Sequence, residues 1–125
     1  VNDFLPVMKK INLVTPNAVE YDFLGLEAAQ AKGEIVMGKD CSVLRKGGHA
    51  TEDMAVDILL HEGKEYRFSS PRLPGCGKHG TGCVLSSAIL ANFALGKPLP
   101  EACQIAKDYM DEFLKSGEGR LGFLR

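Results

Sequence analysis

The sequence predicts an α/β fold, with a partly parallel sheet, helices and an antiparallel hairpin at the edge of the sheet. Residues 11–14 form a short, mainly apolar run that a threonine and a proline end, which is typical of a buried parallel strand. Residues 55–60 and 65–69 form two strand-like runs, and the polar segment 61–64 between them is typical of a hairpin loop. Residues 100–113 place apolar side chains at helical spacing, which indicates an amphipathic helix.

A short helix is predicted over residues 17–24, where Val19, Phe23 and Leu24 recur at helical spacing. Asn17 is a suitable N-cap, and Glu20, three residues on, can complete a capping box. Gly25 closes this helix. The alanine-rich residues 26–32 predict a second helix, and residues 42–46 predict the next strand. Residues 34–40 between them predict a turn or a weakly helical piece.

Lys46 ends this strand and is followed by Gly47, Gly48 and His49. Glycines at the carboxyl end of a strand are typical of ligand sites in open α/β sheets. A lysine there can bind a phosphate as a point charge. A solvated lysine at a strand end explains the same pattern, so spacing alone leaves both interpretations open.

The segment that carries the most chemistry is Gly80-Thr81-Gly82-Cys83, which leads into a long apolar run over residues 84–95. This pattern predicts a glycine-rich loop that enters the N-terminus of a buried helix. The unpaired amides and the dipole of a helix N-terminus suit an anion such as a phosphate, and glycine allows it to approach. A thiol in the first turn has a lowered pKa, so Cys83 is a candidate base.

Two alternatives for this segment remain open. Glycines before a helix often only form a turn, and a cysteine beside an apolar run is often part of the core. Cys76, His79 and Cys83 also have a spacing that suits zinc ligands, although a structural zinc site requires four ligands.

Length and charge restrict the class of protein. The chain has 125 residues and a net charge of −1, which predicts one domain over residues 1–125 and argues against nucleic acid as the main partner. No stretch suits a membrane span. The 4 cysteines lack a disulfide-dense spacing, so we expect reduced thiols and a cytoplasmic protein. Because the chain begins at Val1, we expect it to be a piece of a longer protein.

Three segments together resemble a known family. They are Thr15-Pro16-Asn17 with Glu20, Lys46-Gly47-Gly48-His49, and His79-Gly80-Thr81-Gly82-Cys83. Their order and spacing are similar to those of the hydroxymethylpyrimidine/phosphomethylpyrimidine kinases of thiamine biosynthesis. The resemblance covers residues 11–114 and implies the C-terminal half of a ribokinase-like three-layer α/β fold. The family's N-terminal half, which carries most pyrimidine-binding residues, has no counterpart here.

The resemblance also implies roles for individual residues. Cys83 matches the catalytic base, a position where most of the wider superfamily has aspartate. The anion hole that stabilises the transferred phosphoryl group matches Gly80, Thr81 and Gly82. Phosphoryl transfer depends mainly on such positioning and charge neutralisation.

The cofactors implied are ATP and Mg²⁺. Asn17 and Glu20 match a motif that organises Mg²⁺ and its waters, so we expect them to act on the metal through water. Lys46 and Gly48 match the nucleotide end of the site.

The function implied is ATP-dependent phosphorylation of hydroxymethylpyrimidine and its monophosphate. The partners are then a pyrimidine alcohol and ATP, with a homodimer expected for the full-length protein and no activity for this piece alone. A pyridoxal kinase of the same branch and a non-catalytic module that keeps the fold are the alternatives.

Overall fold

The computed structural model describes residues 4–47, 54–71 and 81–116. The chain divides into two compact units, Val1–Ser69 and Ser70–Arg125, and each is described here by itself. The first unit contains α1 (Phe4–Met8), β1 (Leu13–Val14), α2 (Ala18–Leu24), α3 (Leu26–Ala31), β2 (Ser42–Arg45) and β3 (Met54–His61). It also contains β4 (Lys64–Pro71) except for its last two residues, which follow the boundary. The second unit contains α4 (Thr81–Ala94) and α5 (Leu99–Ser116).

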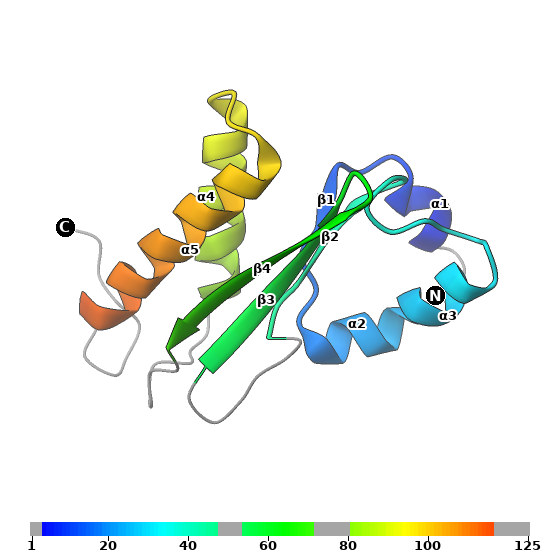
Figure 1. Cartoon of the computed structure of the whole chain (residues 1–125), viewed down its shortest axis with the longest axis horizontal. Coiled ribbons are helices and arrows are strands. Elements are labelled where there is room, and N and C mark those ends of the chain that lie inside the picture. Colours follow the sequence, from blue (N-terminus) through cyan, green and yellow to red (C-terminus); the bar gives the residue numbers. More distant parts are fainter. Residues whose placement is uncertain (1–3, 48–53, 72–80, 117–125) are drawn as a thin grey trace. The chain divides into compact units, whose positions relative to one another are not determined.

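The strands form one sheet in the order β1-β2-β3-β4 (Figure 1). β1 and β2 are parallel, with Leu13 opposite Ser42 and Val14 opposite Val43. β2 and β3 are antiparallel, and β4 lies at the edge of the sheet. The predicted partly parallel sheet with an edge hairpin is therefore confirmed.

The core of the first unit lies between the helices and the sheet. β2 contributes most, because Val43 and Leu44 point to opposite faces and are only 0% and 2% exposed. The core cluster consists of Met8, Tyr21, Leu26, Ala29, Ile35, Met37, Cys41 and Val43. Helices α1, α2 and α3 thus each contribute at least one residue to the same core cluster as β2. This shared core holds α2 close to β2.

The predicted capping of α2 is confirmed. The Glu20 amide donates to Asn17 Oδ1 at 2.7 Å, and the Asn17 amide donates to Glu20 Oε1 at 2.9 Å. Gly25 ends the helix with φ +63°. The predicted apolar face is only partly confirmed. Leu24 packs against the core, but Val19 and Phe23 are 77% and 75% exposed, and Tyr21 is buried instead.

The predicted hairpin loop over residues 61–64 is too long. β3 continues to His61 and β4 begins at Lys64, so Glu62 and Gly63 alone form the turn. Both have positive φ, +50° and +79°, as a type I′ turn requires. This turn matches the right-handed twist of the two strands.

Gly38 illustrates how closely the backbone packs beside this hairpin. It has φ +90°, and an added Cβ would lie 3.2 Å from the His61 nitrogen and from the Leu60 carbonyl carbon. Gly33 also has positive φ, +76°, but a Cβ added there would have nothing within 4 Å.

We expect Gly33→Ala to lower the free energy of unfolding by about 1–2 kcal/mol, the usual penalty for a side chain at positive φ. Gly38→Ala should lower the free energy of unfolding by about 1–3 kcal/mol more than Gly33→Ala does, because neighbouring backbone atoms must also move. Urea unfolding of both variants measures the difference, and equal midpoints would contradict the close approach.

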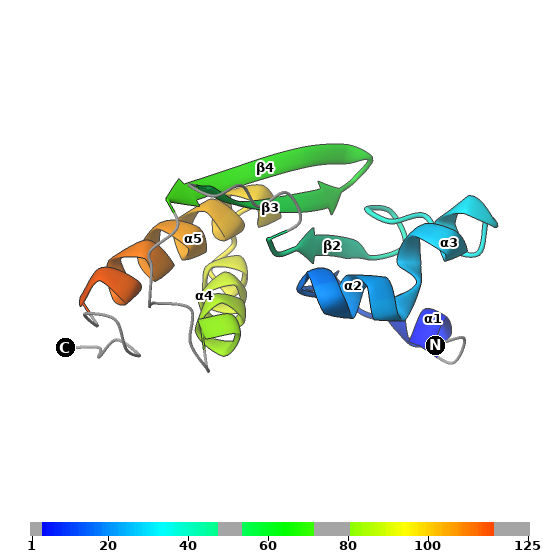
Figure 2. The ribbon, with the colours of Figure 1, turned by 90° about the horizontal axis from the view of Figure 1, so that it is seen from below.

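The second unit is a pair of helices packed against each other (Figure 2). The predicted apolar stripe of α5 is confirmed, since Ala102, Ala106 and Met110 are buried. The prediction that α4 is heavily buried holds only in part. Leu85 and Ile89 are buried, but Leu90 is 67% exposed. Neither these nor the other described helices are long and apolar enough to cross a lipid bilayer.

Candidate active site

Two of the predicted motifs meet at one edge of the sheet. Because β1 and β2 are parallel neighbours, their carboxyl ends lie side by side, and Asn17 follows one while Lys46 follows the other. The Lys46 amide donates to the Pro16 carbonyl at 2.9 Å, and Asn17 and Lys46 form an isolated parallel bridge. Residues far apart in the sequence are thus brought together where α/β sheets commonly bind ligands.

The carboxylate of Glu20 is exposed beside this edge. Its Oε1 atom accepts the Asn17 amide, so the capping box holds the carboxylate in a fixed orientation. A pocket of about 370 Å³ is lined by Val14, Thr15, Pro16, Glu20, Phe23 and Leu24. Glu20 is the only carboxylate among these residues, so it gives an apolar pocket one negative wall.

Asp57 fixes the backbone that follows Lys46, and sequence analysis did not identify it. The Gly47 amide donates to Asp57 Oδ1 at 2.9 Å, and Gly47 has φ +64°. Asp57 is only 5% exposed. Its signal in the sequence is an acidic residue within the otherwise apolar run 55–60, since buried carboxylates need hydrogen-bond donors.

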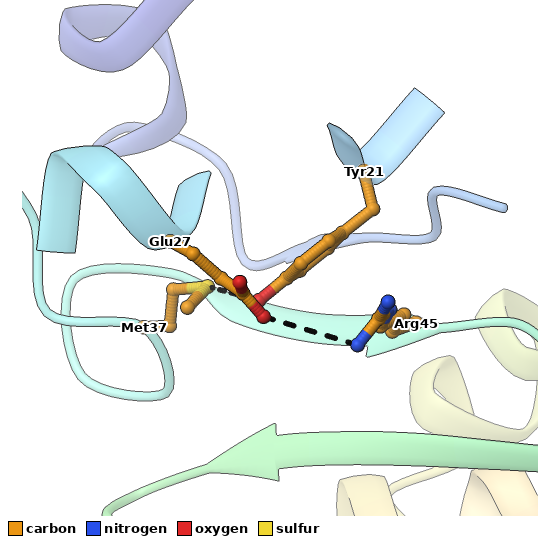
Figure 3. A network of polar contacts seen from close by, with 4 residues as sticks. All are labelled: Tyr21, Glu27, Met37 and Arg45. Carbon is orange, nitrogen blue, oxygen red and sulfur yellow. Dashed lines mark hydrogen bonds and ion pairs between the residues drawn. The ribbon is translucent and has the colours of Figure 1, made fainter. Parts of the chain in front are cut away.

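Arg45 is a second residue that sequence analysis did not identify. Its guanidinium carbon lies 4.3 Å from the centre of the Tyr21 ring, and its Nη1 atom lies 3.9 Å from Glu27 Oε1 (Figure 3). The Tyr21 hydroxyl donates to the Met37 sulfur at 3.6 Å. Burial raises the pKa of Tyr21, and the nearby Glu27 carboxylate adds to the rise, so the hydroxyl stays neutral at physiological pH.

The predicted helix start at the segment Gly80-Thr81-Gly82-Cys83 is confirmed for the backbone. α4 begins at Thr81, so Thr81, Gly82 and Cys83 occupy its first turn. The side chains of these residues and the predicted site residues Gly80 and Gly48 lie outside the described part of the chain. The proposed roles of all five therefore stay predictions.

The zinc alternative also stays untested, because Cys76 and His79 lie outside the described residues. Within the part of the chain that the structure covers, no three His, Cys, Asp or Glu side chains are grouped to hold a metal ion. Cys41, by contrast, is described and is a poor base. Burial raises the pKa of its thiol, which therefore stays protonated and unreactive.

A serine–histidine–glutamate cluster lies at the other end of β2. Ser42 Oγ is 2.7 Å from His61 Nδ1, and His61 Nε2 is 3.0 Å from Glu62 Oε1. Ser42 is only 7% exposed, so its hydroxyl is closed to a substrate. Because Ser42 and His61 are neighbours across β2 and β3, this cluster stabilises the strand pair rather than forming a nucleophilic site.

Comparison with solved structures defines the class of protein. Pyridoxal kinase from Staphylococcus aureus is similar with a TM-score of 0.73 and 26% identity, over 91% of this chain and 46% of that one. A putative phosphomethylpyrimidine kinase from Bacteroides thetaiotaomicron has the same fold, with a TM-score of 0.73, 17% identity and 94% and 44% of the two chains covered. The fold is therefore that of the ribokinase-like small-molecule kinases, as predicted.

Sequence comparison then identifies the family. The family model described as phosphomethylpyrimidine kinase matches residues 4–122, and the chain belongs to this family. The hydroxymethylpyrimidine/phosphomethylpyrimidine kinase of Aquifex aeolicus is 38% identical, over 89% of this chain and 46% of its own length. The Escherichia coli K12 kinase of the same name is 31% identical, over 90% and 45%. The chain thus spans about half the length of these relatives.

Proposed function

We propose that this chain is the nucleotide-binding and catalytic-loop portion of a kinase that uses ATP to phosphorylate hydroxymethylpyrimidine and its monophosphate in thiamine biosynthesis. One observation carries the proposal. In a chain of the phosphomethylpyrimidine kinase family, the segments containing Asn17 and Lys46 lie together at the carboxyl ends of two parallel strands.

The residues at this edge fit ATP phosphates and Mg²⁺. No carboxylate among the described residues forms an ion pair with Lys46, so its ammonium can bind a phosphate. Glu20 offers an exposed carboxylate, a ligand type that Mg²⁺ and its bound waters accept. Mg²⁺ neutralises phosphate charge when bound. Asn17 has its side-chain oxygen engaged in the cap, so it acts mainly by orienting Glu20.

The first turn of α4 supplies the remaining chemistry in this proposal. Its amides, at Thr81 and Gly82, stabilise the negative charge that develops on the transferred phosphoryl group. Cys83, as thiolate, accepts the proton of the substrate hydroxyl. The hydroxyl oxygen then bonds to the γ-phosphorus while the bond to ADP breaks.

Pyridoxal is the second candidate substrate, because the similarity to the S. aureus pyridoxal kinase covers 91% of this chain. Both substrates are ring alcohols of similar size. A cytoplasmic location and a homodimer are further proposals. Val19 and Phe23 support self-association of this piece, since both are large apolar residues exposed on α2.

A hybrid kinase tests the proposed function directly. In the hybrid, this chain replaces the matching portion of the A. aeolicus kinase, which supplies the rest of the protein. We expect ATP- and Mg²⁺-dependent phosphorylation of hydroxymethylpyrimidine and of its monophosphate, measured by ADP release. A folded hybrid without turnover would contradict the proposal. A hybrid that prefers pyridoxal would favour the second candidate.

The chain alone should separate binding from catalysis. We expect it to bind Mg²⁺·ATP weakly and to show no turnover, because it spans only about half the length of its relatives. Titration calorimetry with and without Mg²⁺ measures ATP binding. ADP release in the presence of the pyrimidine alcohol measures turnover. Substrate-dependent ADP release by the isolated chain would contradict the expectation.

A further inference from the structure

Arg45 and Tyr21 connect the two motifs of the proposed site. Tyr21 directly follows Glu20 in α2, and Arg45 directly precedes Lys46 at the end of β2. The guanidinium lies 4.3 Å from the centre of the tyrosine ring, well within the range of a cation–π contact. One side-chain contact therefore joins the immediate neighbours of two proposed ATP-site residues (Figure 3).

The contact is buried on the tyrosine side, which makes it stronger than a surface pair. Tyr21 is 5% exposed, and the Arg45 side chain is 24% exposed. Glu27 contributes less, because its side chain is 72% exposed and its oxygen is 3.9 Å from the guanidinium. The tyrosine ring, and not the carboxylate, is thus the main partner of the arginine.

The Arg45 guanidinium is not fully hydrogen-bonded among the described residues. Its Nε atom is buried without a hydrogen-bond partner among the described residues. A buried donor without an acceptor is unfavourable, and an apolar side chain of similar length would avoid the loss. The stack on the Tyr21 ring is the contact that can offset this cost.

We propose that the Tyr21–Arg45 stack is a positioning clamp, which holds the start of α2 against the end of β2 so that Glu20 and Lys46 face the same nucleotide. The clamp acts beside the Lys46–Pro16 backbone hydrogen bond and keeps that bond closed. Its effect on nucleotide binding depends on the proposed function, whereas its effect on the backbone does not.

Amide hydrogen exchange of the 125-residue chain tests the clamp without any ligand. The Lys46 amide, which donates to Pro16, reports the clamped end of the strand pair. The Ser42 amide donates to Asn12 at 3.1 Å and reports the other end of the same pair. In Arg45→Met and Tyr21→Leu we expect the Lys46 amide to exchange about tenfold faster, with the Ser42 amide unchanged.

Matched variants separate the clamp from general loosening. Tyr21→Phe keeps the ring, so its Lys46 amide should exchange at the normal rate. Glu27→Gln should also change the exchange rate of this amide little. Ile35→Val removes one methylene from the same core, where Ile35 is 1% exposed, and should leave both amides unchanged. An unchanged Lys46 amide in Arg45→Met would overturn the clamp, as would equal acceleration of the Lys46 and Ser42 amides.

Nucleotide titration of the same variants then links the clamp to function. We expect the Kd for Mg²⁺·ATP to rise about three- to tenfold in Arg45→Met and to stay unchanged in Ile35→Val. Normal affinity in Arg45→Met despite faster exchange would remove its positioning role. If the unchanged chain does not bind ATP, the proposed function of this portion fails, and the exchange data still decide whether the backbone clamp exists.

Discussion

Replacing Cys83 by alanine is expected to lower the kcat of the hybrid kinase by about 10²–10⁴-fold, the usual contribution of a positioned base. The start of α4 at Thr81 places Cys83 in the first helical turn, where the helix dipole favours the thiolate. The KM for ATP should change little, because the base acts on the acceptor hydroxyl. Steady-state kinetics with the pyrimidine alcohol measure both constants.

Two further variants make this expectation specific. Cys103→Ala removes another thiol, buried in α5 at 2% exposure, and the folded variant should keep kcat within about twofold. Cys83→Asp should recover much of the activity, because a carboxylate can also accept the proton. Full activity of Cys83→Ala would exclude Cys83 as the base and favour the non-catalytic alternative.

Local signals in the sequence were sufficient for the cap of α2 and for the order of the elements from β1 onward. The Asn17–Glu20 capping box and the Gly25 helix end depend on residues within one helical turn, and all of them were predicted. The apolar run 11–14 was predicted to be a strand of a parallel sheet, and β1 does pair in parallel, with β2 as its neighbour. Helix α1, over Phe4–Met8, was not predicted, since five residues are too short for a periodic pattern.

Contacts between distant residues were not visible in the sequence. Helical spacing selected Val19, Phe23 and Leu24 as the apolar face of α2. Leu24 does pack against the core, but Val19 and Phe23 are exposed, and Tyr21 is the buried residue of the helix. Aromatic rings with a polar end are ambiguous in a periodicity argument. Similarly, the hydrogen bond between Asp57 and Gly47 joins residues ten positions apart, and no spacing rule indicates it.

The candidate site was predicted only in part, as was the fold. The sequence indicated Lys46 as a residue at the carboxyl end of a strand, and the structure places it next to Asn17. The capping box, however, gives Asn17 and Glu20 a structural role that is sufficient to explain both residues. Only an experiment that keeps the cap and removes the charge can distinguish the two roles.

Glu20→Gln is that experiment. Glutamine also completes a capping box, so its side-chain oxygen can still accept the Asn17 amide now bonded at 2.9 Å. We expect the free energy of unfolding to change by less than about 0.5 kcal/mol, as for a surface substitution. The Mg²⁺ concentration needed for half-maximal activity of the hybrid should rise about 10–100-fold, because a neutral amide holds metal-bound water less strongly.

Glu20→Ala and Glu34→Gln complete the comparison. Glu20→Ala removes the cap as well and should cost about 0.5–2 kcal/mol of stability in addition to the loss of metal affinity. Glu34 is exposed in the turn after α3, so Glu34→Gln makes the same charge change away from the site. An unchanged Mg²⁺ requirement in Glu20→Gln, with loss only in Glu20→Ala, would mean that Glu20 caps α2 and does nothing further. If the Mg²⁺ requirement rises in Glu20→Gln but not in Glu34→Gln, the metal role belongs to the Glu20 carboxylate, which borders the pocket beyond β1.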